Sequence, residues 1–385
     1  MAYNCADLAL AGVYVDSVHG INGRTPEETM QNIGLIASPG MTQTEQTIVD
    51  IQQSKGYTEK KNEGDTDMNK RERVTAAFKG QETDHVAVCM WKHVPPSYWA
   101  DDDAFAAYQA KFLRDTDVDF MKLSGDKYFG WPAPILKEIE NPANLYQMKP
   151  LGPNHPYIRG QIERTKKVVK ALENECPAIY LIFAPLSYIR LQIGYPKMMR
   201  FIRENPEAMK YACRTVAEDV KLLVQGILQE SGADGIFFSA QSGEINRFTA
   251  EEYANWVAPS DRMVLDYANT LSDMNAIHFC AWEEVPNRLS VWKDYKAPVV
   301  SWSRFFDIMD IQEAKKHFGC TVWGGFDNRP GSFLYTADRA AIEREVEALI
   351  AQGGKSGYIL GSDCSIHDEL PEEKIRWVVE KARAL

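Results

Sequence analysis

The sequence predicts an α/β fold of the TIM-barrel type, a (β/α)8 barrel, preceded by an N-terminal extension. Three observations support this prediction. Eight short apolar runs follow one another after Asp84, helical patterns lie between most of them, and together they cover about three hundred residues. Strands and helices that alternate on this scale are typical of a barrel of parallel strands.

A doubly wound open sheet is the alternative architecture. Such sheets usually carry a glycine-rich phosphate-binding turn after the first strand. Here the first apolar run ends in Cys89-Met-Trp-Lys-His93, which contains no glycine. The barrel is therefore the preferred prediction.

Residues 1–67 differ from the rest of the chain and are expected to form an extension and linker. They contain a predicted helix over residues 42–55, and residues 57–67 are polar, as expected of a linker. We assign no chemistry to this segment. The barrel is expected over residues 68–385, and it opens with an amphipathic helix over residues 68–78.

The expected strands are short and mostly apolar, as buried parallel strands are. They cover residues 85–90, 118–123, 178–183, 233–239, 275–280, 298–302, 320–325 and 357–361. Long amphipathic helices are expected over residues 206–230, 250–271 and 337–351.

In such a barrel the reacting groups lie at the carboxyl ends of the strands. His93 follows the first predicted strand, Asp126 the second and Glu244 the fourth, so these three are candidate catalytic residues. The candidates for substrate binding are Trp91, Gln241, Trp282, Asp327 and Asn328. Structural alternatives are a loop histidine at 93, a helix cap at 126, turn formation at 327–328, and ordinary packing for the tryptophans.

A soft metal site is predicted at the ends of the fifth and eighth strands. His278 and Cys280 alternate along residues 275–280, so their side chains share one face of the strand. Cys364 follows the eighth strand and is expected to meet them across the barrel mouth. One His and two Cys ligands with an open position are the arrangement of catalytic zinc. The alternative is a core histidine with two buried cysteines.

A fourth protein ligand is left open, with Glu244, Asp327 and Asp363 as candidates. Glu244 is alternatively expected to hydrogen-bond the second ring nitrogen of His278. His367 is an alternative ligand in a predicted solvated loop. Zinc held by one neutral imidazole and two thiolates has about zero net charge, and it suits activation of either a thiol or a methylated oxygen.

Composition excludes several classes of function. The formal charge is −11 and the pI is near 5.3, so no basic surface is expected to follow nucleic-acid phosphates. No apolar run is long enough to span a bilayer. The first residues lack the features of a signal peptide, and seven scattered cysteines do not suggest a disulfide framework. A cytoplasmic location is expected, and a homodimer stays open.

Three further motifs are Arg71-Glu-Arg-Val-Thr-Ala-Ala-Phe-Lys-Gly80, Gly324-Gly-Phe-Asp-Asn-Arg329 and Leu360-Gly-Ser-Asp-Cys364. With the His-x-Cys…Cys pattern, they make residues 69–385 resemble the zinc methyltransferase branch of the uroporphyrinogen decarboxylase superfamily, which includes the methylcobamide:coenzyme M methyltransferases. The resemblance implies that His278, Cys280 and Cys364 bind zinc. It also implies methyl transfer to or from a corrinoid (cobalamin) carried by a separate protein. The usual glycine after His-x-Cys is replaced here by Ala281 and Trp282, a departure that concerns the acceptor pocket.

Two other functions are weighed against this one. Porphyrinogen decarboxylases of the same superfamily bind a polycarboxylate through an arginine-rich segment after the first strand. This chain has Met90-Trp-Lys-His-Val-Pro-Pro-Ser-Tyr-Trp99 there, without arginine. A metal-free decarboxylase with Asp126 as its key carboxylate is therefore the second prediction. The third is a barrel whose zinc only stabilises the fold, and which serves a corrinoid protein as binding partner or chaperone.

The corrinoid is expected on a partner protein and not on this chain. Cobalamin-carrying domains of known families use an Asp-x-His-x-x-Gly loop, and the sequence contains no such motif. The small-molecule methyl donor or acceptor stays unassigned, as does the direction of transfer.

Overall fold

The structure is a computed structural model of the chain, and it describes residues 67–281 and 284–385. The chain divides into two units, Met1–Thr66 and Asp67–Leu385. The expected extension and linker, including the helix predicted over residues 42–55, lie outside the described residues except for Asp67, and so does Trp282. The second unit is an α/β domain.

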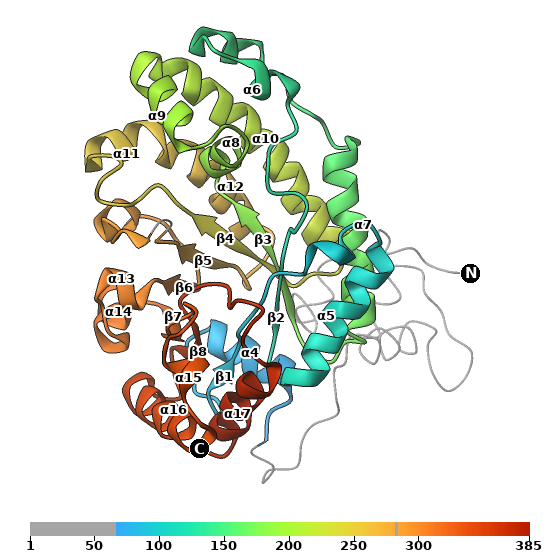
Figure 1. Ribbon diagram of the computed structural model, residues 1–385, viewed down its shortest axis with the longest axis vertical. Coiled ribbons are helices and arrows are strands. Elements are labelled where there is room, and N and C mark those ends of the chain that lie inside the picture. Colours follow the sequence, from blue (N-terminus) through green and yellow to red (C-terminus); the bar gives the residue numbers. More distant parts are fainter. Residues whose placement is uncertain (1–66, 282–283) are drawn as a thin grey trace, which may run out of the picture. The chain divides into compact units, whose positions relative to one another are not determined.

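The centre of this domain is a parallel eight-stranded sheet that curls on itself (Figure 1). Its strands are β1 (Ala87–Val88), β2 (Met121–Leu123), β3 (Ala178–Phe183), β4 (Gly235–Ala240), β5 (Ala276–Phe279), β6 (Val299–Trp302), β7 (Thr321–Phe326) and β8 (Tyr358–Ser362). They pair in the order β1-β8-β7-β6-β5-β4-β3-β2. All eight predicted strands are confirmed, with ends that differ by at most three residues.

The two edge strands, β1 and β2, are bridged by Asp119, which lies just before β2. Its backbone N–H donates to Val88 O at 2.9 Å, and its Oδ2 accepts the N–H of Val88 at 2.7 Å. Arg73 donates to its other carboxylate oxygen at 2.7 Å. These bonds connect the two edge strands and satisfy backbone groups that an open sheet edge leaves unpaired. The curled sheet therefore has the form of a TIM-barrel-like fold.

Helices cover the outer face of the sheet (Figure 1). The longer ones are α5 (Asp102–Thr116), α7 (Pro156–Ala171), α10 (Pro206–Gln229), α12 (Ala258–Asn269), α16 (Arg339–Gly353) and α17 (Glu372–Arg383). The shorter ones are α4 (Lys70–Phe78), α6 (Pro134–Glu138), α8 (Pro185–Ile193), α9 (Tyr195–Glu204), α11 (Ala250–Trp256), α13 (Arg304–Asp307), α14 (Ile311–Phe318) and α15 (Phe333–Thr336). The 3-10 turns of the described residues are η2 (Pro96–Tyr98), η3 (Pro142–Gln147) and η5 (Leu289–Trp292).

The helical pattern predicted over residues 250–271 is confirmed, but it is divided. The structure has two helices there, α11 and α12, which meet at Val257. Pro259 explains the break, since proline has no N–H to donate to the preceding turn and is accommodated in the first turn of a new helix. The helices predicted over residues 206–230 and 337–351 are confirmed as α10 and α16.

Alternate strand residues form a separate aromatic core inside the curled sheet. The ring of Trp323 lies 5.0 Å from that of Phe120 and 5.3 Å from that of Phe237, measured between centroids. Phe78 of α4 joins this core with its ring 5.7 Å from Phe120. The interior of the sheet is thus filled with side chains, as in TIM barrels generally, and reacting groups belong at the carboxyl ends of the strands.

Candidate metal centre

β5 places two of the predicted ligands on the inner face of the sheet. Ile277 and Phe279 pack into the outer core under the helices, so the alternate residues His278 and Cys280 face inward. Cys280 continues the strand pairing, because its N–H donates to Ala240 O at 3.1 Å. His278 and Cys280 thus share one face of the strand, as predicted.

Cys364 reaches the same point from the end of β8. Pairing continues past that strand, since the N–H of Asp363 donates to Phe326 O at 2.9 Å. One ligand atom from each of His278, Cys280 and Cys364 lies within 4.8 Å of the other two. Because β5 and β8 are not neighbours in the sheet, the cluster forms across the mouth of the curled sheet.

The imidazole of His278 is held in one orientation. Its Nδ1 lies 3.0 Å from the hydroxyl of Ser301, the residue opposite it on β6. Phe237 stacks on the ring at 5.2 Å, and Trp91 meets it edge-on at 6.4 Å. Ser301, and not Glu244, is therefore the hydrogen-bond partner of this imidazole. Its Nε2 is buried and has no nitrogen or oxygen partner, and the interaction of this imidazole with the Cys364 thiol lowers the pKa of that thiol, so the nitrogen is placed to bind a metal ion beside the sulfur.

The two thiols of the cluster are electrostatically coupled. Their mutual hydrogen bond raises the pKa of Cys280 and lowers the pKa of Cys364, and burial raises the pKa of Cys280 further. Two adjacent thiols ionise one after the other, because a second negative charge beside the first is unfavourable. A cation placed between the sulfurs removes that penalty and favours two thiolates.

The cluster contains three candidate metal ligands. Within residues 67–281 and 284–385, no other group of three or more His, Cys, Asp or Glu side chains comes close enough to hold a metal ion. Glu244 instead accepts a hydrogen bond from Tyr195 at 3.2 Å, and Asp363 accepts a backbone N–H at 2.9 Å. Asp327 is paired with Arg329 at 2.5 Å. The described part of the chain therefore supplies three candidate ligands at this point, the number found in catalytic zinc sites.

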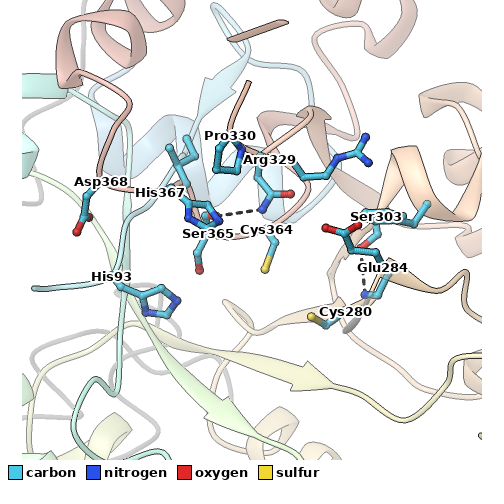
Figure 2. A pocket seen from close by; sticks show the side chains of 14 residues that line it. His93, Cys280, Glu284, Ser303, Arg329, Pro330, Cys364, Ser365, His367 and Asp368 are labelled. Carbon is cyan, nitrogen blue, oxygen red and sulfur yellow. Dashed lines mark hydrogen bonds between the residues drawn. The ribbon is translucent and has the colours of Figure 1, made fainter. Parts of the chain in front are cut away.

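A cavity of about 630 Å³ lies beside the thiols. Figure 2 shows the side chains of Cys280, Cys364 and His93 pointing into it from different elements. The cavity is lined by His93, Cys280, Ala281, Glu284, Ser303, Phe306, Asn328, Arg329, Pro330, Cys364, Ser365, Ile366, His367 and Asp368. A space of this size accommodates a small molecule. His367, the alternative ligand, lines the cavity but is outside the metal cluster.

His93 and Asp126 form a hydrogen-bonded pair at this cavity. His93 Nδ1 lies 2.8 Å from Oδ1 of the fully buried Asp126. The other oxygen of Asp126 accepts the N–H of Val94 at 2.7 Å, and the hydroxyl of Ser124 lies 3.3 Å from His93 Nδ1. A buried carboxylate that orients an imidazole in this way leaves the second ring nitrogen for proton exchange with a ligand. The sequence pattern predicted both residues as catalytic candidates, but it did not predict that they form a pair.

Gln241 and Glu244 lie behind the cavity wall in a buried polar cluster. Gln241 hydrogen-bonds the thiol of Cys280, and its Oε1 accepts from Arg190 at 2.6 Å. Burial raises the pKa of Glu244 above its usual range, and Tyr195 donates to its carboxylate. Neither Gln241 nor Glu244 lines the cavity, so the position of Gln241 favours a role in holding Cys280, whereas Glu244 acts on that thiol only through its charge.

Of the other described candidates for substrate binding, Asn328 lines the cavity, whereas Trp91 and Asp327 do not. Trp91 is buried, and its indole N–H donates to Ser365 Oγ at 2.8 Å. Asn328 lines the cavity and donates to Ser365 O at 3.1 Å. Asp327 accepts the backbone N–H of Arg329 at 3.0 Å, which matches its turn-forming alternative.

Two buried cations near the cluster were not proposed from the sequence. Arg190 lies on α8, where its charge interrupts an apolar stretch, and Lys122 lies in the centre of β2. Both are at most 5% exposed. The sequence signal for Lys122 is a charged residue within an apolar strand. The sequence alone does not show whether this side chain faces the inside of the sheet.

The fold and the site together define an α/β protein with a candidate metal centre at the carboxyl ends of its strands. The family model of uroporphyrinogen decarboxylase (URO-D) matches residues 129–385, and the chain belongs to this family. His278, Cys280 and Cys364 fall within the matched residues, whereas His93 and Asp126 precede them.

Solved structures resemble this fold at low sequence identity. A methyltransferase from Methanosarcina mazei has a TM-score of 0.65 and 16% identity, with 82% of this chain and 98% of that chain covered. A B12-independent methionine synthase from Shewanella sp. W3-18-1, in complex with selenomethionine, has a TM-score of 0.40 and 12% identity, with 58% and 65% covered. No curated protein sequence matches the chain. Among the described residues, no helix is long and apolar enough to cross a membrane.

Proposed function

We propose that this protein is a zinc-dependent methyltransferase that moves a methyl group between a corrinoid on a partner protein and a small molecule. The observation that carries the proposal is the cluster of His278, Cys280 and Cys364 beside a cavity of about 630 Å³. The structural neighbour from Methanosarcina mazei is a methyltransferase, which supports the reaction class. We propose a cytoplasmic location for the reaction, because thiols stay reduced there.

The donor set fits zinc. Two sulfurs and one imidazole nitrogen are soft to borderline ligands, which exclude magnesium and calcium and suit zinc. Ligand atoms around tetrahedral zinc are about 3.5–3.8 Å apart, given bond lengths of about 2.0–2.3 Å. The cluster atoms lie within 4.8 Å of one another, so small side-chain rotations suffice. The buried Nε2 of His278, which has no nitrogen or oxygen partner, gains a metal contact in the same step.

The residues around the cavity have separate tasks in this proposal. When bound, zinc supplies a positive charge that lowers the pKa of a coordinated thiol or polarises a methylated oxygen. Asn328 and Ser303 present polar groups to the small molecule. His93, oriented by Asp126, exchanges a proton with the heteroatom that gains or loses the methyl group. Gln241 keeps the Cys280 side of the site fixed through its hydrogen bond to the thiol.

Metal analysis tests the proposal. Protein purified under reducing conditions is expected to hold about one zinc per chain, and His278→Ala, Cys280→Ala and Cys364→Ala are each expected to lose it. Cys320→Ala is the matched control, since Cys320 is half-buried like Cys364 but lies outside the cluster. Zinc retained in all three ligand variants, or absent from the folded wild-type protein, contradicts the proposal. Methyl transfer is then assayed with methylated corrinoid protein and candidate thiols or methoxy compounds.

The alternative functions give other outcomes in the same experiment. A metal-free decarboxylase keeps its activity when the zinc is removed. A protein that uses zinc only for stability binds no exogenous ligand at the metal, because structural zinc sites are closed by four protein ligands. Arg329, a basic residue of the cavity wall, is already paired with Asp327, which leaves little positive charge for a polycarboxylate substrate.

A further inference from the structure

Lys122 places an ammonium group inside the curled sheet. Its neighbours on β2, Met121 and Leu123, pack into the outer core, so the lysine side chain faces inward, and the residue is only 3% exposed. Its Nζ lies 5.3 Å from the ring centroid of Trp91 and 5.4 Å from that of Phe237. The ring faces of both aromatics attract a cation at this range.

The same two rings hold the candidate zinc ligand. Phe237 stacks on the His278 imidazole with an interplanar angle of 24°, and Trp91 meets it edge-on. One layer of aromatic side chains therefore connects the ammonium of Lys122 to the metal-binding imidazole. This layer also excludes water, so charges on its two sides interact through a medium of low dielectric constant.

The ammonium lacks a close carboxylate partner. Among the described residues, no Asp or Glu oxygen lies within 4.0 Å of its Nζ, although other buried cations such as Arg73 and Lys92 are ion-paired. The anionic or ionisable groups that face it are Asp126 and the thiols of Cys364, Cys89 and Cys280. Burial lowers the pKa of Lys122 to about 8, because taking an unpaired charge out of water is unfavourable.

Lys122 does not touch the substrate cavity. It is absent from the cavity wall, so it is not placed to act as a nucleophile or as a direct ligand of a bound molecule. Its charge can still act on the cluster through space. A buried cation without a close partner retains its charge more easily when an anionic group forms nearby.

We propose that Lys122 is the buried counter-charge of the metal centre and makes it prefer an anionic ligand at its open position. This inference rests on the proposed function. Zinc with two thiolates and a neutral imidazole has no net charge, so an incoming thiolate or alkoxide leaves the centre at −1. The ammonium brings the sum back to zero. Lys122 is a positioning residue in this role, since it stabilises the anionic form of the bound small molecule without contacting it.

The test compares an anionic with a neutral probe at the metal. Cobalt(II) replaces zinc, and the visible absorption of the cobalt-loaded protein reports the binding of azide or of pyridine at pH 7. In Lys122→Met, the dissociation constant of azide is expected to rise about tenfold, while that of pyridine stays within about twofold of wild type. Methionine keeps the length of the side chain and removes its charge. Lys122→Gln serves as the second neutral variant if the first does not fold.

Lys92→Met is the matched control, because Lys92 is equally buried but is paired with Glu372 at 3.0 Å and bonded to backbone carbonyls. This variant is expected to lower the unfolding temperature without changing the ratio of the dissociation constants of azide and pyridine. A wild-type ratio in folded, cobalt-loaded Lys122→Met overturns the role of Lys122 and leaves the proposed function intact. A folded neutral variant that no longer binds cobalt also overturns it. Wild-type protein that binds no metal overturns both.

Discussion

The substitution Ser301→Ala tests how the candidate metal centre is organised. Ser301 is fully buried on β6, and its hydroxyl lies 3.0 Å from Nδ1 of His278. When Nε2 of the imidazole binds the metal, Nδ1 carries the proton and donates it to this oxygen. The hydrogen bond fixes both the tautomer and the ring orientation. Alanine removes the acceptor and leaves a buried N–H unsatisfied.

The expected magnitude follows from the loss of that one bond. Removing a buried partner of this kind costs about 1–3 kcal/mol, and loss of a hydrogen bond to a metal-binding histidine lowers metal affinity about 10–100-fold. The two estimates agree, since each factor of ten corresponds to about 1.4 kcal/mol. The ring contacts with Phe237 and Trp91 persist in the variant, so the histidine stays in place and zinc binding is weakened and not abolished.

The assay is a competition for zinc between the protein and a chromophoric chelator at neutral pH under reducing conditions. Ser303→Ala is the control, because Ser303 lies just beyond the same strand and accepts the N–H of Ala281 at 3.1 Å without touching His278. Its zinc affinity is expected to stay within about threefold of wild type, as for a change that leaves the ligands and their partners intact. Equal zinc affinities in Ser301→Ala and Ser303→Ala would refute the assignment of Ser301 as the partner of the metal-binding imidazole.

Three further predictions concern proton transfer, pH and packing. Asp126→Asn is expected to keep the zinc content but to slow methyl transfer about 100-fold, because His93 loses the carboxylate that orients it; unchanged turnover under saturating substrate contradicts this role. Burial raises the pKa of Asp261 from 3.8 to about 7, so the folded state holds this proton more tightly than the unfolded state and stability falls as pH rises from 4 to 7. Unfolding midpoints measured over that range are expected to show a shallower decline in Asp261→Asn, and parallel curves for the two proteins contradict the assignment. Gly235→Ala is expected to destabilise the fold by about 3 kcal/mol or more, since the added Cβ would meet the backbone oxygen of Met274 at 1.8 Å; a wild-type denaturation midpoint contradicts this.

Local sequence patterns were sufficient for much of the fold. The eight apolar runs became the eight strands, and the alternation along residues 275–280 placed His278 and Cys280 on one face, because side chains of a strand alternate by geometry alone. The helical pattern predicted over residues 250–271 is divided at Pro259, where the local rule for proline should have outweighed the continuous amphipathic pattern.

The partners of the site residues were beyond the reach of local patterns. Ser301, and not Glu244, bonds to His278, because strand register decides which side chains face each other across a ladder. Asp126 holds His93 from the neighbouring strand end, a pairing that depends on the path of two loops. Lys122 lies in an apolar run, and its place beside the rings of Trp91 and Phe237 became known only with the inner face of β2.

The sequence by itself determined the α/β class, the strand positions and the three residues of the candidate metal site, since these follow from periodicity, turn residues and ligand chemistry. Only the tertiary structure decided that His278, Cys280 and Cys364 meet across the mouth, within 4.8 Å and beside a cavity that also contains His93. It also decided which buried charges surround them. The physical reason is that these contacts join residues far apart in the chain, and their distances are set by the curvature of the sheet and the packing of its interior, which no local stretch of sequence encodes.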